Sequence, residues 1–291
     1  MTSMKGGALE IASDLFRVLR VPRMGRGIFA MQAIPANTVV LVEEPLVSTP
    51  PVSKVKEGSW CPTCCSPGHA CGHTHDAADM SALYGYCEDR GFKWPLLMAK
   101  LAKRALRAKK DDGDQTLERM RLLCSVNLEG REVQLEEQRQ AVLGCLAQEA
   151  TDSPVEETIT GEWYIDMYSR IQANAFRLDL IDSVALQAGT SGDYQAVLRA
   201  MLARQEEDDG GSAVYTVASL VNHSCVPNMD VAFPNNDHTL VLRTNQTVRE
   251  NEQLTISYVD HEQDVAERAR RLAMYGFRCE CEKCREETVD T

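Results

Sequence analysis

The chain has 291 residues, of which 44% are hydrophobic and 25% are charged, as in a soluble globular protein of one large domain or two small ones. Its formal net charge of −12 argues against nucleic acid as the main partner and fits a basic partner, such as a Lys-rich peptide. No apolar run approaches the roughly 20 residues that a membrane span needs, so we expect no membrane partner.

Residues 1–55 are expected to form short strands. Phe16 and Val18 alternate with charged residues, and two largely apolar runs follow, at 27–30 and 39–42. The turns that separate these runs are marked by Pro, Gly and Asn.

Residues 56–92 hold five of the eleven cysteines and three of the six histidines. Clustered Cys and His without a secretion signal indicate zinc in a reducing compartment rather than a disulfide framework. The segment is also rich in Gly, Pro and Asp, so we expect an irregular loop that folds around metal.

The middle of the chain is expected to be helical. Apolar residues recur at helical spacing from Trp94 to about residue 150, and another helix is expected over 163–175. Lys100 and Arg104 belong to a basic stripe on the first helix, which we interpret as a solvated face rather than a site for nucleic acid or an acidic partner. Strands are expected again at 229–233, 240–243 and 254–258, and a last helix at 265–274.

Three cysteines, Cys279, Cys281 and Cys284, lie within six residues of one another near the end of the chain. Zinc takes four tetrahedral ligands, so this group lacks one. Either a distant residue completes a closed structural site, or the site is open and catalytic. Cys225, the last residue of an Asn-His-Ser-Cys segment, is the obvious donor.

Five motifs, in their order along the chain, resemble the SET domain of lysine methyltransferases, in the branch that combines SET and MYND domains with a post-SET zinc site. They are Gly25-Arg26-Gly27, Asn174-Ala175-Phe176 in a helical segment, Asn222-His223-Ser224-Cys225, Ile256-Ser257-Tyr258, and Tyr275-x-Phe277-x-Cys279-x-Cys281-x-x-Cys284. The resemblance covers both β-rich ends of the chain.

The resemblance implies an α+β protein with a β-rich SET fold of small antiparallel sheets and a pseudoknot, interrupted by a helical, zinc-binding insertion. The expected parts are the N-terminal part of the SET domain (1–55), a degenerate MYND-like Cys/His insertion (56–92), a helical insertion (93–165), the C-terminal part of the SET domain (166–264) and a post-SET zinc segment (265–291).

The activity that the resemblance implies is that of a protein-lysine N-methyltransferase, which transfers a methyl group from S-adenosylmethionine to a lysine side chain. Tyr258 would be the catalytic hydroxyl, and Tyr275 and Phe176 would be walls of the lysine channel. A narrow apolar channel suits this chemistry because desolvation disfavours the ammonium form of the lysine. The residues implied for the cofactor are Arg26, Gly27, Asn174, Asn222, His223 and, stacked on the adenine, Phe277.

By the same resemblance, one structural zinc ion is bound by Cys225, Cys279, Cys281 and Cys284. A second zinc ion is expected in the insertion. Because no Cys follows Cys87 at short spacing, we expect a single ion there rather than the two metals of a MYND module. Its expected ligands are Cys61, Cys64, Cys87 and one of Cys71, His73 or His75. The alternative is a degenerate loop that binds no metal.

Each aromatic residue has a plainer interpretation when it is taken alone: Tyr258 in a strand is most often a packing residue, and Phe176 and Phe277 are most often core. The joint order of the motifs favours the enzyme over the alternative function, a catalytically inactive SET-fold module that binds other proteins. We expect a monomer whose substrate is a histone, a ribosomal protein or another basic protein, in the nucleus, the cytoplasm or both. A histone substrate would make it a chromatin regulator.

Overall fold

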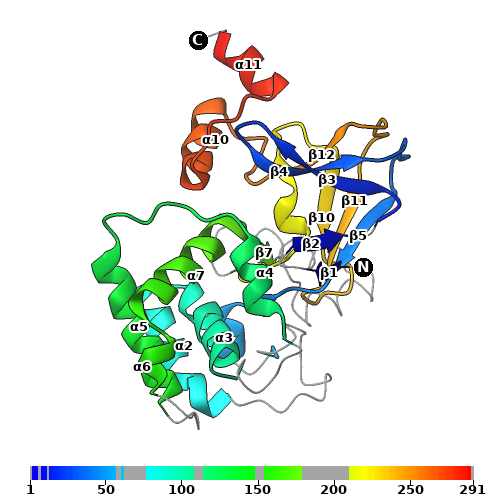
Figure 1. Cartoon of the computed structure of the whole chain (residues 1–291). Coiled ribbons are helices and arrows are strands. Elements are labelled where there is room, and N and C mark those ends of the chain that lie inside the picture. The colour runs from blue at the N-terminus through cyan, green and yellow to red at the C-terminus, as the bar shows by residue number, and fades with distance from the viewer. Residues whose placement is uncertain are drawn as a thin grey trace, which may run out of the picture.

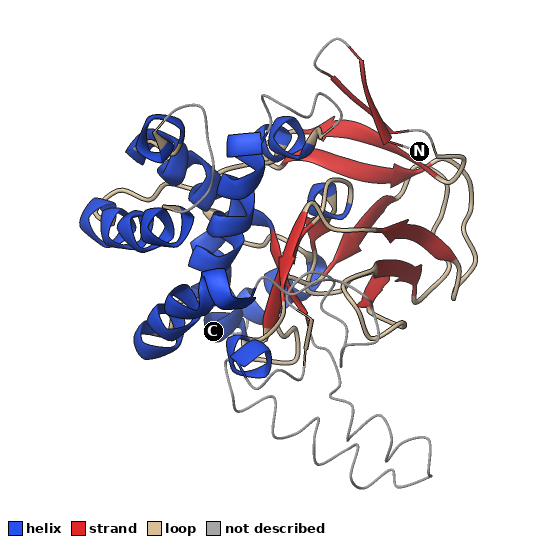
Figure 2. Cartoon of the chain, turned by 90° about the horizontal axis from the view of Figure 1, so that it is seen from below, coloured by secondary structure: helices blue, strands red, loops and turns tan. Residues whose placement is uncertain are grey.

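The computed structural model describes residues 2–5, 8–11, 13–56, 60–61, 77–107, 114–147, 154–178 and 210–289. In this part of the chain a helical region and a β-rich region lie side by side, and both views show the same separation (Figures 1 and 2). None of the described helices has the length and apolar character that a membrane span requires.

The described strands form small sheets of two to four strands, with the orders β1-β2, β10-β11-β5, β3-β4-β12-β9 and β6-β8-β7. Their pairing is antiparallel except between β9 and β12, which are parallel. The expectation of an α+β fold with small antiparallel sheets is confirmed. The strands are β1 (Thr2–Lys5), β2 (Ala8–Ile11), β3 (Phe16–Val21), β4 (Gly25–Ala30), β5 (Val39–Glu43), β6 (Val47–Thr49), β7 (Ala175–Leu178), β8 (Gly211–Val214), β9 (Asn222–His223), β10 (Met229–Ala232), β11 (Leu240–Thr244) and β12 (Gln253–Ile256).

Helices fill the middle of the chain, as the periodicity predicts, and return near its C-terminus. They are α1 (Val52–Lys56), α2 (Ala77–Arg90), α3 (Trp94–Arg107), α4 (Thr116–Leu122), α5 (Glu132–Leu146), α6 (Val155–Thr158), α7 (Gly161–Asn174), α10 (Val265–Leu272) and α11 (Glu282–Val289), with short 3₁₀ turns η1 (Ala218–Leu220) and η2 (Ala273–Tyr275).

Helix α2 corrects the expectation of an irregular loop throughout residues 56–92. Its buried residues Met80, Leu83, Tyr84 and Cys87 recur at i, i+3, i+4 and i+7, which is the spacing of one helix face. This helical spacing is present in the sequence, but the Gly, Asp and Cys of the segment are more typical of an irregular loop.

The end of α7 corrects a second expectation, because Phe176 lies on a strand and not in a helical segment. Thr160 caps the start of α7 by accepting a 3.1 Å hydrogen bond from the backbone N–H of Trp163, and the helix ends at Asn174. Ala175 is extended and begins β7. Side chains on a strand alternate between its two faces, so this change decides which way Phe176 points.

Two hydrophobic cores lie under the two regions. One is made chiefly by α2, α3, α5 and α7, and the other by the sheets around β4, β11 and β12. Two side chains of the basic stripe of α3 are tied to the segment around β6, so the stripe is not wholly the solvated face that we expected. Lys100 donates a hydrogen bond to the carbonyl of Ser48, and Arg104 donates one to the carbonyl of Leu46, next to β6.

Two polar side chains, the half-buried Glu43 and the buried Asn228, hold the segment from η1 to β9 in place. The carboxylate of Glu43 accepts hydrogen bonds of 2.8 to 3.1 Å from the backbone N–H groups of residues 216–218. Asn228 donates to the carbonyl of Gln253 at 2.9 Å and accepts from the backbone N–H of Thr255 at 2.8 Å. These contacts fix β9 beside β12, where most of the predicted site residues lie.

Candidate functional site

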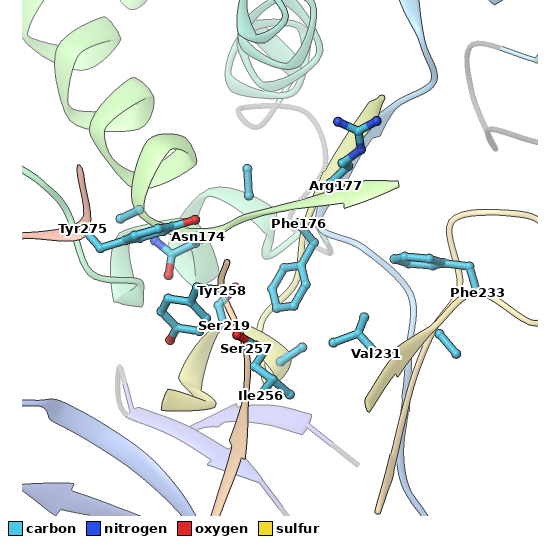
Figure 3. A pocket seen from close by; sticks show the side chains of 14 residues that line it. Asn174, Phe176, Arg177, Ser219, Val231, Phe233, Ile256, Ser257, Tyr258 and Tyr275 are labelled. Atoms are coloured by element: carbon cyan, nitrogen blue, oxygen red, sulfur yellow. The ribbon is translucent and has the colours of Figure 1, made fainter. Parts of the chain in front are cut away.

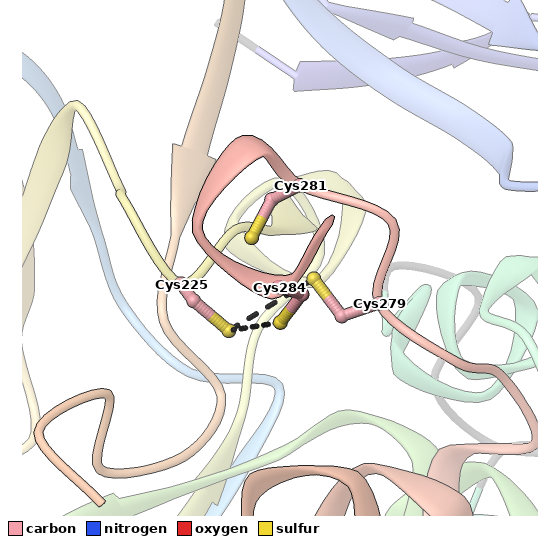
Figure 4. A group of neighbouring side chains, drawn as sticks. All are labelled: Cys225, Cys279, Cys281 and Cys284. Atoms are coloured by element: carbon pink, nitrogen blue, oxygen red, sulfur yellow. Dashed lines mark hydrogen bonds between the residues drawn. The ribbon is translucent and has the colours of Figure 1, made fainter. Parts of the chain in front are cut away.

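Four cysteines from two distant segments meet beside α11 (Figure 4). Cys225 follows β9, Cys279 and Cys281 follow η2, and Cys284 lies on α11. The Sγ atom of Cys225 is 3.5 Å from that of Cys284 and 3.9 Å from that of Cys279, and all four sulfurs lie within 4.8 Å of one another.

These positions fit a tetrahedral metal ion. Sulfurs that each lie about 2.3 Å from a zinc ion stand about 3.8 Å apart, which is close to the observed separations. The cluster therefore has the geometry to hold a metal ion. With four cysteine ligands the tetrahedron is complete, which is typical of a closed, structural site rather than a catalytic one.

The four thiols perturb one another's ionisation. Burial raises the pKa of Cys279 to about 11, and negative charge on Cys281 and Cys284 adds to this shift. Burial also acts to raise the pKa of Cys281, but hydrogen bonds from the backbone N–H groups of Cys284 and Cys225 outweigh it and lower this pKa to about 7. A divalent cation would offset the repulsion among the thiolates, so the donor set suits one.

Arg268 on α10 is a buried cation beside this cluster. Its side chain is 1% exposed and lies 3.6 Å from the sulfur of Cys284 and 2.5 Å from the carboxylate of Glu287. Four thiolates around a divalent ion leave an excess of negative charge, which the guanidinium offsets in part. Sequence reasoning missed Arg268 because α10 carries other arginines, and only burial sets it apart.

The imidazole of His223 lies between the cysteine cluster and Tyr258. Its Nε2 atom is 3.3 Å from the sulfur of Cys225, and its Nδ1 atom accepts a 3.0 Å hydrogen bond from the backbone N–H of Tyr258. Burial, together with the positive charge of Arg268, lowers the pKa of His223 to about 4, so the ring is neutral near pH 7. Since both ring nitrogens have protein partners, the predicted cofactor contact of His223 would fall to its backbone.

Tyr258 is surrounded by aromatic rings. Its ring centroid lies 5.1 Å from that of Tyr275 and 6.3 Å from that of Phe277. Its hydroxyl donates a 2.6 Å hydrogen bond to the carbonyl of Val221, and burial raises its pKa, so the hydroxyl stays protonated. Because Val221 takes its only hydrogen, the oxygen offers lone pairs to any ligand that reaches it.

A first cavity of about 470 Å³ opens beside Tyr258 (Figure 3). The two residues predicted as channel walls, Phe176 and Tyr275, both line it, and Phe233 closes the side away from Tyr258. The ring of Phe176 packs edge-on against that of Tyr215, with centroids 5.4 Å apart, which fixes its orientation. The structure thus brings the three predicted catalytic residues to one cavity with several aromatic rings in its wall.

A second cavity, of about 580 Å³, lies between the β3–β4 turn, Asn222 and Cys124, and Tyr258 lines it as well. The predicted cofactor residues Arg26 and Asn222 are part of its wall. The guanidinium of Arg26 donates a hydrogen bond to the carbonyl of Leu122, so this side chain ties the wall to the end of α4.

Gly27 lies beside this second cavity at a close approach of two side-chain amides. A Cβ atom at this position would come within 2.6 Å of Nε2 of Gln253 and 2.8 Å of Nδ2 of Asn222. Both of these amide nitrogens, and the hydroxyl of Ser219, are buried with no hydrogen-bond partner among the described residues. Buried donors without partners are costly, so they indicate a polar ligand that completes them.

The two cavities meet at Tyr258 and Ser219, which line both. Asn174, predicted to contact the cofactor, lines the first cavity instead, and its amide donates to the carbonyls of Cys124 at 2.8 Å and Arg170 at 2.7 Å. Phe277 lines neither cavity and packs against His223, with ring centroids 6.0 Å apart.

Sequence reasoning missed Ser219, Gln253 and Cys124 as neighbours of the second cavity. None of them belongs to a motif, and nothing in the surrounding residues marks them. Only the packing of η1, β12 and the segment after α4 around one space brings them together.

The second metal site predicted in the insertion stays a prediction. Cys64 and His73 lie outside the described residues. Cys61 is buried, and Cys87 lies on α2 within the helical core, where burial raises the pKa of its thiol to about 12. A metal ion at Cys87 would have to lower that pKa in order to bind the thiolate.

Comparison with known proteins gives a consistent family. The profile of the SET domain family matches residues 25–259. Histone-lysine N-methyltransferase ATXR4 of Arabidopsis thaliana is 27% identical over 97% of this chain and 90% of its own length. Histone-lysine N-methyltransferase SMYD3 of Homo sapiens is 37% identical, but over only 29% of this chain and 20% of its own length. A solved structure of Rubisco LSMT bound to sinefungin and monomethyllysine has a TM-score of 0.47 and 16% identity, over 95% of this chain and 53% of that one.

Proposed function

Because this chain belongs to the SET domain family, we propose that it is an S-adenosylmethionine-dependent protein-lysine N-methyltransferase. The observation that carries the proposal is the meeting of two cavities at the buried hydroxyl of Tyr258. One cavity has several aromatic rings in its wall, as a lysine side chain needs, and the other is bordered by unpartnered polar groups, as a polar methyl donor needs. A relative that spans most of this chain is named a histone-lysine N-methyltransferase.

The chemistry asks the residues to position groups rather than to exchange protons with them. S-adenosylmethionine supplies an electrophilic methyl group on a sulfonium, and the methyl carbon–sulfur bond breaks as the carbon–nitrogen bond forms. The apolar walls made by Phe176 and Tyr275 disfavour the lysine ammonium, so the amine sheds a proton to solvent before transfer. Holding the two reactants in line supplies most of the rate enhancement.

Tyr258 acts in this proposal as an acceptor that orients the reactants. Its hydroxyl hydrogen is taken by Val221, and its pKa is raised, so it does not serve as a base. Its lone pairs remain able to accept hydrogen bonds from the lysine amine and from the polarised methyl group. The residues proposed to bind the methyl donor are Arg26, Gly27 and Asn222, which border the second cavity, and, on the motifs alone, Asn174, His223 and Phe277. His223 would act through its backbone.

The test is transfer of labelled methyl groups into fractionated cell extract by wild type and by Tyr258→Phe. We expect the variant to lose about 100-fold in rate, as misplacement of reacting groups commonly does. Tyr164→Phe is the matched control, because the hydroxyl of Tyr164 is buried in the helical core and has no hydrogen-bond partner among the described residues. Cofactor binding by calorimetry without transfer to any protein would instead favour the inactive, protein-binding module.

Zinc is the ion that we propose for the four-cysteine cluster. Soft thiolates in a closed tetrahedron favour zinc over magnesium or calcium, which prefer oxygen ligands. Elemental analysis of purified protein tests this identity, and we expect one zinc per chain from this cluster. A second equivalent would support the site proposed in residues 56–92, and Cys64→Ser would then remove only that equivalent.

For the substrate, we propose a lysine-containing basic protein, such as a histone or a ribosomal protein. The net charge of −12 supports this, because an acidic surface attracts a basic chain. We further propose a monomer in the nucleus, the cytoplasm or both. Size-exclusion chromatography with light scattering and imaging of a fluorescent fusion test these two points.

A further inference from the structure

The side chain of His223 contacts both the cysteine cluster and the backbone of Tyr258, two residues after the end of β12. It is 5% exposed, and β9 places it opposite Ile256 in the parallel pair with β12. Its Nε2 atom lies 3.3 Å from the sulfur of Cys225, and its Nδ1 atom lies 3.0 Å from the backbone nitrogen of Tyr258. One imidazole therefore spans the distance between the predicted metal centre and the predicted catalytic tyrosine.

These two contacts fix where the ring hydrogen lies. The backbone N–H of Tyr258 can only donate, so Nδ1 must be the bare acceptor and the hydrogen of the neutral ring must be on Nε2. The Nε2–H group then donates to the sulfur of Cys225. A metal-bound thiolate is a good acceptor for this bond, whereas a free thiol carries its own hydrogen and accepts weakly.

We propose that His223 is a positioning residue that couples the metal state of the four-cysteine cluster to the position of Tyr258. A metal ion keeps Cys225 as a thiolate, the thiolate holds Nε2–H, and the oriented ring holds the backbone N–H of Tyr258. The hydroxyl of Tyr258 is thereby kept where the two cavities meet. The proposal rests on the proposed function only for its last step, the effect on methyl transfer.

Three variants of the metal-loaded protein separate the two contacts. His223→Asn keeps an acceptor near the position of Nδ1 for the N–H of Tyr258 but is too short to reach Cys225. His223→Gln extends an amide N–H toward the position of Nε2 and keeps a donor for the sulfur. His223→Leu removes both contacts. Circular dichroism and metal content per chain establish that each variant is folded and loaded.

Two readouts require no methyl transfer. With cobalt(II) in the cluster, the thiolate-to-metal absorption band moves to longer wavelength when a thiolate loses a hydrogen bond. We expect this shift in His223→Asn and His223→Leu but not in His223→Gln. We expect hydrogen exchange of the Tyr258 amide to be faster in His223→Leu than in wild type, and slowed again in His223→Asn. An unshifted band in His223→Asn, or unchanged exchange in His223→Leu, overturns the proposal.

The kinetic readout tests the last step. The coupling from the cysteine cluster to Tyr258 needs both contacts of His223, so we expect each variant to lower kcat by about 10- to 100-fold. The loss in His223→Leu should be no larger than in the other two variants. The KM for S-adenosylmethionine should stay nearly unchanged. If the loss of kcat in His223→Leu equals the combined losses of His223→Asn and His223→Gln, the two contacts have separate structural roles and the coupling is overturned. The expected spectral shifts in a protein that transfers no methyl group would sink the proposed function and leave the link between cluster and Tyr258 intact.

Discussion

The helical region and the C-terminal segment hold their helices in place by different means. Helix α3 buries eight of its fourteen residues, whereas α10 buries only Arg268 and Leu272. Apolar burial is the main contribution that positions α3, and the hydrogen bonds of Lys100 and Arg104 add to it. We expect helices α10 and α11 to depend instead on the cysteine cluster and on the Arg268–Glu287 ion pair. Because Tyr275 and Phe277 lie between these two helices in the chain, we expect one wall around Tyr258 to depend on the proposed metal ion rather than on a hydrophobic core.

Removing the metal ion should give the largest difference in stability between the C-terminal segment and the helical region. We expect Cys284→Ser, or treatment with a chelator, to remove hydrogen-exchange protection from residues 265–289 and to leave α3 and α5 protected. Structural zinc sites contribute about 10–16 kcal/mol to the folding of the segments that bind them. Exchange measured by mass spectrometry gives the result for each segment, with Cys145→Ser in α5 as the matched control. Equal loss of protection in both regions would contradict the division.

The opposite perturbation is made in the helical core. Leu97 is fully buried on α3, and we expect Leu97→Ala to lower the free energy of unfolding by about 2–5 kcal/mol. Urea unfolding measures this loss. The metal content per chain should stay at the wild-type value because the cysteine cluster lies outside this core. Metal loss at native conditions would show that the two regions are not independent.

Variants of Arg268 test whether its positive charge helps the cysteine cluster to retain its metal ion. Arg268→Met keeps much of the volume but removes the charge that offsets the thiolates, so we expect metal transfer to a chelator to be about 10- to 100-fold faster. Arg268→Lys should fall between the variant and wild type, because it keeps the charge without the planar donor group. Arg270→Met is the control, since Arg270 is 71% exposed. Chelation at the wild-type rate in Arg268→Met would remove the proposed electrostatic role.

The smallest effect is expected from an exposed ion pair on α10. Glu267 accepts hydrogen bonds from Arg270 and Arg271, which lower its pKa to about 2 from an ordinary value of 4.5. A carboxyl whose pKa is lowered by folding stabilises the fold above its ordinary pKa, and this contribution fades as the pH falls toward 2. The melting temperatures of wild type and Glu267→Gln should therefore differ near neutral pH and converge on acidification. A gap that persists in strong acid, or in high salt, would need another cause.

How much of the structure could be predicted from the sequence depends on whether the relevant pattern is local or depends on tertiary contacts. Apolar periodicity is local, so the positions of α3, α5, α7 and the strands around Tyr258 could be predicted from it. Helix α2 carried the same signal but was missed because its cysteine was interpreted first as a metal ligand. Asn174 shows a second limit: its motif predicted a cofactor contact, but its amide donates to the carbonyls of Cys124 and Arg170.

By itself the sequence determined the fold class, the four cysteines that lie together, and the three residues around the first cavity. Spacing and residue type are enough for the cysteines, because a tetrahedral thiolate cluster leaves few alternatives. The fold class and the three residues came from the ordered motifs that resemble the SET family. Only the tertiary structure decided that Arg268 is buried, that Ser219 lines both cavities, and that His223 touches Cys225 and Tyr258 together. Burial of a charge and the direction of a side chain depend on which elements pack against it, and no local pattern carries that information.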